Sequence, residues 1–165
     1  MNILLMGNGG REHALAWKLS QSQRFGKLWI APGNPGTEIY GENISSAELD
    51  NPSQILNIVQ KKQVDLVVIG PEGPLELGIS DVLRNENIPV FGPSKSAAQL
   101  ETSKSFANTL MREYGIDTAE SQTFDSAERA INYVRALNGP CVIKANGLAA
   151  GKGVTVCDTI DEAIY

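Results

Sequence analysis

The sequence predicts an α/β protein, built as a doubly wound parallel sheet and followed by the start of a second part with a different construction. Two observations carry this prediction. From residue 3 to residue 91, short apolar runs of strand length alternate with helical segments, and each run ends at Gly or Pro. From residue 94 onward, helical stretches lead instead to two strands that a glycine-rich loop joins. Strands and helices that alternate along a chain form βαβ units with parallel strands.

The first two predicted strands lie near the amino end of the sequence. Ile3–Met6 is a continuous apolar run that ends at Gly7, which is typical of a strand buried on both faces. Residues 11–19 favour a helix. Leu28–Ala31 is then expected to form the second strand, and Pro32-Gly33 ends it.

A capped helix leads to the third strand. Asp50 or Asn51 is a suitable N-cap, and Pro52 suits the first turn. Val64–Ile69 is the third strand, and Gly70-Pro71 ends it.

The fourth strand closes the predicted sheet. A helix around residues 77–86 leads to Ile88–Phe91. Pro89 lacks the N–H group that a central strand needs, so it places this strand near an edge or at its ladder start.

The second part begins with helices. Residues 94–114 favour a long helical stretch broken near 101–103, and Gly115 suits its carboxyl end. Residues 116–124 are irregular to extended. Asp125 with Glu128 resembles a capping box. The helix that follows is expected to bury Ala127, Ala130, Ile131, Val134 and Leu137.

A hairpin and a short helix follow this helix. Cys141–Ala145 and Val154–Cys157 are predicted strands, and residues 161–164 favour a last helix. Both cysteines lie in strand-like segments without CxxC spacing. Free thiols in a reducing cytosol are the preferred interpretation, with a disulfide as the alternative.

Composition excludes two classes of partner. The 165 residues are 42% apolar and 20% charged, with a net charge of −5. A moderately acidic chain argues against bulk binding to nucleic acid. No apolar stretch approaches the roughly 20 residues that span a bilayer, and the amino end lacks a signal peptide. We therefore expect a cytoplasmic protein without nucleic-acid or membrane partners.

Glycine- or proline-rich loops follow each of the four strands. In parallel α/β sheets, ligands bind at the carboxyl ends of the strands. These loops are therefore expected to form a single ligand-binding rim: Gly7–Arg11, Pro32–Thr37, Gly70–Leu75 and Gly92–Ser94.

The first glycine loop, Gly7–His13, follows a strand and opens a helix, which suits a phosphate or phosphosugar. A tight structural turn and a dinucleotide-binding GxGxxG loop are the alternatives. The third glycine of that fingerprint falls on Glu12, and the second strand does not end in an acidic residue, so NAD is disfavoured. His13 is interpreted as a packing or capping residue rather than a catalyst.

The second glycine loop, residues 144–153, differs from a P-loop. Gly147 and Gly151 enclose three residues instead of four, and a strand follows instead of a helix. A glycine-rich hairpin that folds over phosphates, with Lys144 and Lys152 near their charge, is the preferred interpretation, and a plain flexible hairpin is the alternative.

Together these motifs closely resemble the glycinamide ribonucleotide synthetase (phosphoribosylamine–glycine ligase) family of the ATP-grasp superfamily. The resemblance covers essentially the whole chain. The segments that carry it are Gly7–His13, Ala31–Thr37, Gly70–Glu72, Gly92–Lys104 (with Gly92–Lys95, Glu101, Ser103 and Lys104) and Lys144–Val154.

The resemblance implies a pre-ATP-grasp domain with a linker helix over residues 1–120. It also implies part of an ATP-grasp lid subdomain over residues 121–165. The implied activity is ATP-dependent ligation of glycine to 5-phosphoribosylamine through glycyl phosphate, in de novo purine biosynthesis. Glycinamide ribonucleotide, ADP and phosphate are the products. Such catalysis needs positioning and charge neutralisation but no protein nucleophile, so no catalytic residue is assigned.

The resemblance also implies the site residues. The phosphoribosylamine side comprises Gly9, Gly10, Arg11, Asn34, Gly36, Thr37 and Glu72, and Glu72 suits ribose hydroxyls or the amine. The ATP side comprises Lys104, Lys144, Gly147, Leu148, Ala149, Ala150, Gly151, Lys152 and Gly153. Asn146 replaces the Asp expected in the lid motif.

ATP is the implied co-substrate and Mg²⁺ the implied cofactor. By the resemblance, the Mg²⁺ ligands and the adenine-binding strand lie beyond Tyr165, so no metal ligand is expected within these residues and the chain alone is expected to be inactive. The parent enzyme is expected to be a monomer. The alternatives are a stand-alone nucleotide- or phosphosugar-binding module and another ATP-grasp carboxylate–amine ligase. A carbamoyl-phosphate or biotin-carboxylase-like ATP-grasp enzyme would share the lid but should differ in the Gly7–His13 and Pro32–Thr37 loops.

Overall fold

The computed structural model describes residues 1–149 and 151–165. Within them the chain divides into two compact units, Met1–Ala98 (unit 1) and Gln99–Tyr165 (unit 2). The domain boundary expected near residue 120 stays a prediction.

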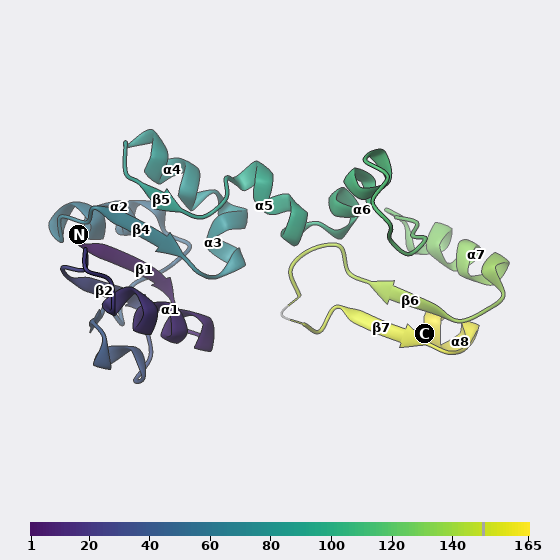
Figure 1. Ribbon diagram of the computed structural model, residues 1–165. Coiled ribbons are helices and arrows are strands. Elements are labelled where there is room, and N and C mark those ends of the chain that lie inside the picture. Colours follow the sequence, from purple (N-terminus) through teal and green to yellow (C-terminus); the bar gives the residue numbers. More distant parts are fainter. Residues whose placement is uncertain (150) are drawn as a thin grey trace. The chain divides into compact units, whose positions relative to one another are not determined.

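Unit 1 contains a parallel sheet, which confirms the predicted α/β class (Figure 1). Over the described residues its order is β3-β2-β1-β4-β5. The expected fourth strand is β5, and it lies at an edge, in agreement with Pro89. The strands are β1 (Ile3–Gly7), β2 (Leu28–Pro32), β3 (Glu42–Asn43), β4 (Leu66–Ile69) and β5 (Val90–Phe91).

Helices connect these strands. Asn51 is the N-cap of the helix before β4, and its side chain accepts the Gln54 N–H at 3.1 Å, so the predicted cap is confirmed at Asn51. The helical elements of unit 1 are α1 (Gly10–Ser20), the 3-10 turn η1 (Thr37–Ile39), α2 (Pro52–Lys61), α3 (Glu72–Leu77), α4 (Ile79–Asn85) and α5 (Lys95–Thr102), which continues into unit 2.

One expectation for unit 1 was wrong. The segment Gly70–Leu75 was expected to be a loop, but α3 begins at Glu72. Pro74 lies in the first turn of α3, where backbone N–H groups have no partner within the helix, so its missing N–H costs nothing. The helix expected around residues 77–86 is confirmed as α4, and Gly78, at φ +86°, separates it from α3.

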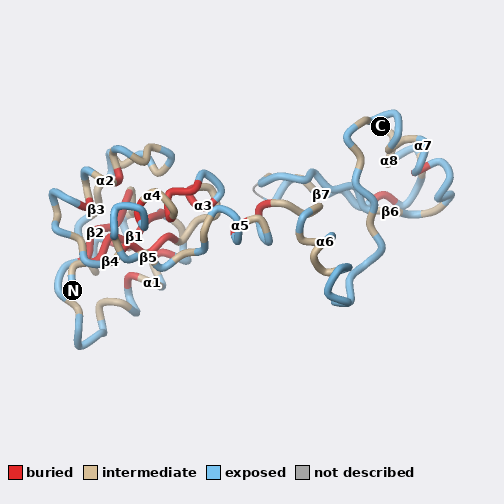
Figure 2. Tube along the Cα trace, turned by 90° about the horizontal axis from the view of Figure 1, so that it is seen from above, coloured by how far each residue is buried: buried red, intermediate tan, exposed pale blue. Residues whose placement is uncertain are grey.

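Apolar side chains on both faces of the sheet form the core of unit 1. Successive strand residues point to opposite faces, so Leu4 and Met6 pack on one face while Ile3 and Leu5 pack on the other. Ile55 of α2 and the helices α3 to α5 contribute to the first face, and Ala16 of α1 covers the second. Figure 2 shows the buried residues concentrated in these strands.

Unit 2 contains a two-stranded antiparallel sheet and flanking helices. Ser103 breaks the long helical stretch, as predicted, because its hydroxyl caps the next helix by accepting the Phe106 N–H at 3.3 Å. The complete elements of unit 2 are α6 (Lys104–Glu113), α7 (Ala127–Leu137), β6 (Cys141–Lys144), β7 (Val154–Cys157) and α8 (Ile160–Ile164).

The predicted capping box of α7 was wrong. Ser126 is the N-cap residue of this helix, without a side-chain cap hydrogen bond. Asp125 lies one residue too early to cap, and it pairs instead with Arg129 at 3.1 Å. The buried face is also narrower than expected, since Val134 is buried but Leu137 is 47% exposed.

The two cysteines are free thiols, as preferred from the sequence. They lie opposite each other on β6 and β7, where Cys157 is buried and Cys141 is half-buried. Desolvation raises the pKa of the Cys157 thiol above its ordinary value. Across the residues the structure describes, no helix is long and apolar enough to cross a membrane.

Candidate functional site

The candidate site of unit 1 lies where the sheet order reverses. From β1 the chain runs first to β2 and β3 and later returns to pair β4 against the other side of β1. At such a switch point, neighbouring loops leave the sheet in opposite directions and open a crevice that typically binds ligands. The loops after β1 and β4 flank this point.

Arg11 links these two loops. Its guanidinium Nη1 donates to the Gly70 carbonyl at 2.7 Å and pairs with Glu72 Oε1 at 2.9 Å. Both side chains are substantially exposed, so the pair adds little stability and mainly orients the two groups. The pKa of the Glu72 carboxyl lies below its ordinary value, because its backbone N–H and then Arg11 donate hydrogen bonds to it. Glu72 is therefore an anionic acceptor at neutral pH.

Asn34 links the loop after β2 to the loop after β1. Its side-chain Nδ2 donates to the Asn8 carbonyl at 2.9 Å. Its Oδ1 accepts the N–H groups of Gly36 at 2.8 Å and of Thr37 at 3.2 Å. One amide group thus fixes both the shape of its own turn and the position of its neighbour.

The side chains of Thr37 and Asn43 stabilise the Asn34 turn through hydrogen bonds to its backbone. The buried Thr37 hydroxyl accepts the Asn34 N–H at 2.9 Å and lies 2.7 Å from Asn43 Oδ1. Asn43 Nδ2 donates to the Asn34 carbonyl at 2.7 Å. A Cβ on Gly33, at φ +75°, would lie 2.1 Å from Asn43 Oδ1, so this position requires glycine. Sequence reasoning missed Asn43 because a two-residue polar strand gives no apolar pattern.

Glu12 is a second residue that sequence reasoning missed. Its carboxylate is buried and accepts the Gly9 N–H at 2.7 Å. The available signal was its place at the third helical position, where Glu often bonds back to the residue before the helix.

His13 packs beneath the Asn34 turn, as its interpretation as a packing residue predicts. Its ring lies 5.6 Å from the Tyr40 ring, centroid to centroid. A Cβ on Gly36 would lie 3.0 Å from His13 Cε1, so Gly36 permits this close approach.

The structure brings together the residues assigned to the phosphosugar. Gly9, Gly10 and Arg11 start α1, Glu72 starts α3 beside Arg11, and the Asn34–Thr37 turn is tied to the same loop. This arrangement combines a helix N-terminus and a guanidinium with an anionic acceptor. The first two attract phosphate, and the carboxylate suits hydroxyl or amine donors.

The glycine-rich hairpin of unit 2 continues β6 and β7. Lys144 pairs with Val154, and the Ala145 N–H donates to the Gly153 carbonyl at 2.8 Å. Gly151 has φ +78°. A Cβ on Gly153 would lie 2.5 Å from the Ala149 Cβ. These two positions need glycine for different reasons, one for backbone conformation and one for space.

Lys104 and Asn146 join α6 to this hairpin. Lys104 Nζ donates to the Gly147 carbonyl at 3.0 Å. Asn146 Oδ1 accepts the Ser105 N–H at 2.9 Å and lies 3.4 Å from the Ser103 hydroxyl. Asn146, which departs from the expected Asp, therefore acts as an acceptor at the start of α6.

The remaining residues assigned to ATP lie on the exposed hairpin. Lys144, Gly147, Leu148, Gly151 and Lys152 are exposed, while Ala149 and Gly153 are half-buried. The assignment of Ala150 falls outside the described residues.

The open face of the hairpin is apolar. By the strand register, Lys144 shares one face with Val142, Val154 and Val156, which are 47%, 48% and 73% exposed. Lys144 thus stands at the end of an apolar strip, next to the glycine-rich loop. No three His, Cys, Asp or Glu side chains lie close enough to hold a metal ion in the part of the chain that the structure describes.

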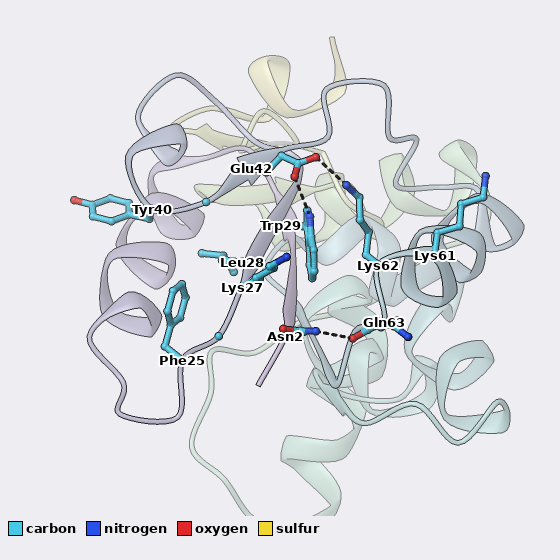
Figure 3. Close-up of a pocket in the computed structure, with 12 residues that line it drawn as sticks. Asn2, Phe25, Lys27, Leu28, Trp29, Tyr40, Glu42, Lys61, Lys62 and Gln63 are labelled. Carbon is cyan, nitrogen blue, oxygen red and sulfur yellow. Dashed lines mark hydrogen bonds and ion pairs between the residues drawn. The ribbon is translucent and has the colours of Figure 1, made fainter.

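A separate cavity of about 590 Å³ opens beside residues that precede β1, β2 and β4, away from the rim (Figure 3). Glu42 lies in it and accepts from Trp29 Nε1 at 3.2 Å and from Lys62 Nζ at 2.9 Å. The Lys62 hydrogen bond is the main cause that lowers the pKa of Glu42. Ligands of parallel α/β sheets bind at the carboxyl ends of the strands. This cavity lies at the opposite edge of the sheet, so it is not the candidate site.

Comparisons with known proteins match both units. The family model for phosphoribosylglycinamide synthetase, N domain, matches residues 1–101, and that for its ATP-grasp (A) domain matches residues 102–165. The phosphoribosylamine–glycine ligase of Mesorhizobium japonicum is 53% identical over 163 residues, which are 99% of this chain and 38% of that relative.

Solved structures resemble the chain as well. The crystal structure of phosphoribosylamine–glycine ligase from Thermotoga maritima matches with a TM-score of 0.76 at 33% identity, covering 99% of this chain and 38% of that one. The biotin carboxylase domain of Hydrogenobacter thermophilus 2-oxoglutarate carboxylase, in complex with MgADP, matches with a TM-score of 0.77 and the same coverage. At 15% identity, that likeness shows the fold alone.

Proposed function

Because this chain belongs to the phosphoribosylglycinamide synthetase family, we propose that the whole protein uses ATP to ligate glycine to 5-phosphoribosylamine. The products are glycinamide ribonucleotide, ADP and phosphate, in de novo purine biosynthesis. The chain spans 38% of the length of the curated relative from Mesorhizobium japonicum. The observation that carries the proposal is the junction of three loops at the switch point of the sheet, held by Arg11 and Asn34.

These loops are proposed to bind the phosphosugar. Its phosphate lies at the start of α1, where backbone N–H groups and the helix dipole favour an anion, and Arg11 adds a positive charge. Glu72 accepts hydrogen bonds from ribose hydroxyls or from the amine. Its lowered pKa keeps it ionised for this purpose.

The hairpin of unit 2 is proposed to cover ATP. The apolar strip beside Lys144 suits a flat base, and the glycine-rich loop allows phosphates to approach its backbone. Lys104 and Lys144 supply positive charge from α6 and β6. Lys152 lies exposed on the same loop.

The proposed reaction needs two substitutions and no protein nucleophile. A glycine carboxylate oxygen attacks the γ-phosphorus of ATP, and the bond to the ADP oxygen breaks. The amine of phosphoribosylamine then attacks the carbonyl carbon of glycyl phosphate, loses a proton, and phosphate leaves. The protein contributes by positioning the reactants and by neutralising phosphate charge.

ATP and Mg²⁺ are proposed as co-substrate and cofactor. Mg²⁺ prefers carboxylate oxygens, and within the described residues no acidic cluster fits it, so no step is assigned to the metal. The free thiols suit a cytosolic enzyme. We also propose that the protein is a monomer that needs neither nucleic acid nor membrane.

The test compares the full-length protein with residues 1–165 alone. Phosphoribosylamine, glycine and ATP are supplied together and then each is omitted, while ADP and glycinamide ribonucleotide are measured. We expect turnover by the full-length protein only when all three are present, and none by residues 1–165. Turnover with another amine acceptor, or binding of ribose 5-phosphate without turnover, would contradict the proposed reaction. Clear turnover by residues 1–165 would contradict the expected inactivity of this chain.

A further inference from the structure

Glu12 is a buried charge that the proposed reaction does not use. Its side chain is 4% exposed, and no other Asp, Glu, Lys or Arg among the described residues is buried to this degree. A carboxylate is costly to bury unless hydrogen bonds compensate. Glu12 lies in the first turn of α1, so this buried carboxylate is next to the proposed phosphate site.

Glycines make the space that this carboxylate occupies. A Cβ on Gly7 would lie 2.6 Å from Glu12 Cδ, and a Cβ on Gly70 would lie 2.0 Å from Glu12 Oε1. Gly7 ends β1, and Gly70 follows β4. The carboxylate therefore lies between the two strand ends that flank the switch point.

Glu12 and Arg11 fix these loops from opposite sides. Glu12 Oε2 accepts the Gly9 N–H at 2.7 Å beneath the rim. Arg11 reaches the Gly70 carbonyl at 2.7 Å on the exposed side. Two consecutive residues of α1 thus determine the distance between the loops.

The bond to Glu12 also decides which backbone donor faces a ligand. The Gly9 N–H points to the buried carboxylate, so it is committed within the protein. Gly10 is exposed, and a Cβ built on it would meet nothing within 4 Å. The first helical turn is thereby open to a ligand at Gly10 and closed at Gly9.

We propose that Glu12 is a positioning residue for the phosphosugar: it binds the Gly9 N–H, fixes the glycine loop against Gly70, and leaves the Gly10 N–H to bind phosphate. This inference rests on the proposed function of the same site. In this role Glu12 acts as a hydrogen-bond acceptor for the Gly9 N–H. The side-chain amide of Gln has the same length and can accept the same hydrogen bond.

The test uses three variants of the full-length protein. Glu12→Met keeps the length of the side chain but removes the acceptor, Glu12→Gln keeps an acceptor, and Glu86→Gln, at the exposed end of α4, is the matched control. For Glu12→Met we expect a rise of about tenfold or more in the KM for phosphoribosylamine, as the loss of one charged hydrogen bond predicts. Glu12→Gln and Glu86→Gln should stay within about threefold of wild type. The KM for ATP should not change in any variant.

Urea unfolding separates this role from a purely structural one. Glu12→Met leaves the Gly9 N–H without its acceptor, so its unfolding midpoint should fall. The KM for phosphoribosylamine should still be raised at urea concentrations far below that midpoint, where the variant is folded. A folded Glu12→Met variant with wild-type KM would overturn the inference, and so would equal losses in Glu12→Met and Glu12→Gln.

A measurement on the wild-type protein covers the case in which Glu12→Met does not fold. Ribose 5-phosphate is titrated into full-length protein labelled with ¹⁵N-glycine, and amide shifts are followed. We expect a saturable shift at Gly10 that is larger than the shift at Gly9, and the reverse order would overturn the inference. If the wild-type protein does not bind ribose 5-phosphate, the proposed function fails together with the inference. If it binds and Gly9 responds most, only the inference fails.

Discussion

The glycines of the rim in unit 1 and those at the tip of the hairpin in unit 2 have different surroundings. In unit 1, Gly7, Gly33 and Gly70 leave room for protein side chains, and a Cβ at any of them would lie 2.0–2.6 Å from Glu12 or Asn43. In unit 2, a Cβ at Gly147 or Gly151 would meet nothing within 4 Å among the described residues. These three rim glycines are therefore surrounded by protein side chains before a ligand arrives, whereas Gly147 and Gly151 leave their space open. Gly153, at the base of the hairpin loop, is an exception because it lies close to Ala149.

This difference shows that glycine content alone does not describe a phosphate loop. The neighbours of each glycine decide whether a loop is rigidly formed or exposed. Substitutions at both sites probe that contrast.

Gly70→Ala should give the largest effect, because its Cβ would overlap the buried Glu12 carboxylate. We expect the free energy of unfolding, measured in urea, to fall by about 2–3 kcal/mol, because the added methyl group overpacks a tight core. Gly147→Ala is the counterpart in the open loop and should change stability by less than about 0.5 kcal/mol. Equal losses in the two variants would remove the contrast between the loops.

Thr37→Val tests the support beneath the Asn34 turn. The substitution keeps the shape of a buried side chain but leaves the Asn34 N–H without its acceptor. We expect a loss of about 1–2 kcal/mol in urea unfolding, together with weaker binding of ribose 5-phosphate. Thr123→Val, at an exposed position, is the control. Unchanged stability in Thr37→Val would show that the hydroxyl does not hold the turn.

Asn146→Ala tests the anchor of the open loop. It removes the oxygen that accepts the Ser105 N–H at the start of α6, which is expected to cost about 1 kcal/mol. Hydrogen exchange at the Ser105 amide should accelerate, and exchange in unit 1 should not. Asn146→Asp retains an acceptor and should restore protection. Faster exchange in Asn146→Asp than in Asn146→Ala would contradict this role.

The smallest effect is expected from acid titration of the rim. The folded-state pKa of Glu72 lies below the ordinary value of 4.5, so its contribution to stability is present above pH 4.5 and is lost as the pH falls through the folded pKa. Arg11→Met removes part of the cause. The decrease in urea midpoint below pH 4.5 should therefore be shallower in Arg11→Met than in wild type. Arg135→Met, on α7, should follow the wild-type decrease, and a steeper decrease in Arg11→Met would contradict the assignment.

Sequence reasoning succeeded where a pattern is local or repeated. Strands such as Ile3–Gly7 are buried on both faces, so their apolar runs are visible without a structure. The cap at Asn51 and the break at Ser103 are decided by side chains within a few residues. The parallel order of the strands also predicted that the loops after β1, β2 and β4 meet at one edge, and the ligand-binding role of this rim stays a prediction.

Sequence reasoning failed where a residue's structure depends on a neighbour that is distant in sequence. Strand β3 consists of two polar residues whose pairing with β2 is visible only in the sheet. Asn43 supports the Asn34 turn across nine positions of sequence. Glu12 was noticed only because it replaces the third glycine of a dinucleotide loop. The space that its side chain occupies depends on Gly70, which lies 58 positions later in the sequence.

The shared space of Glu12, Gly7 and Gly70 has a consequence for sequence variation. A side chain at position 70 would overlap the space that Glu12 fills. A gene library that randomises positions 12 and 70 together should therefore yield larger residues at 70 only in clones with a small residue at 12. Among related sequences, we expect substitutions at positions 12 and 70 to occur together, because both residues determine the spacing of the two loops.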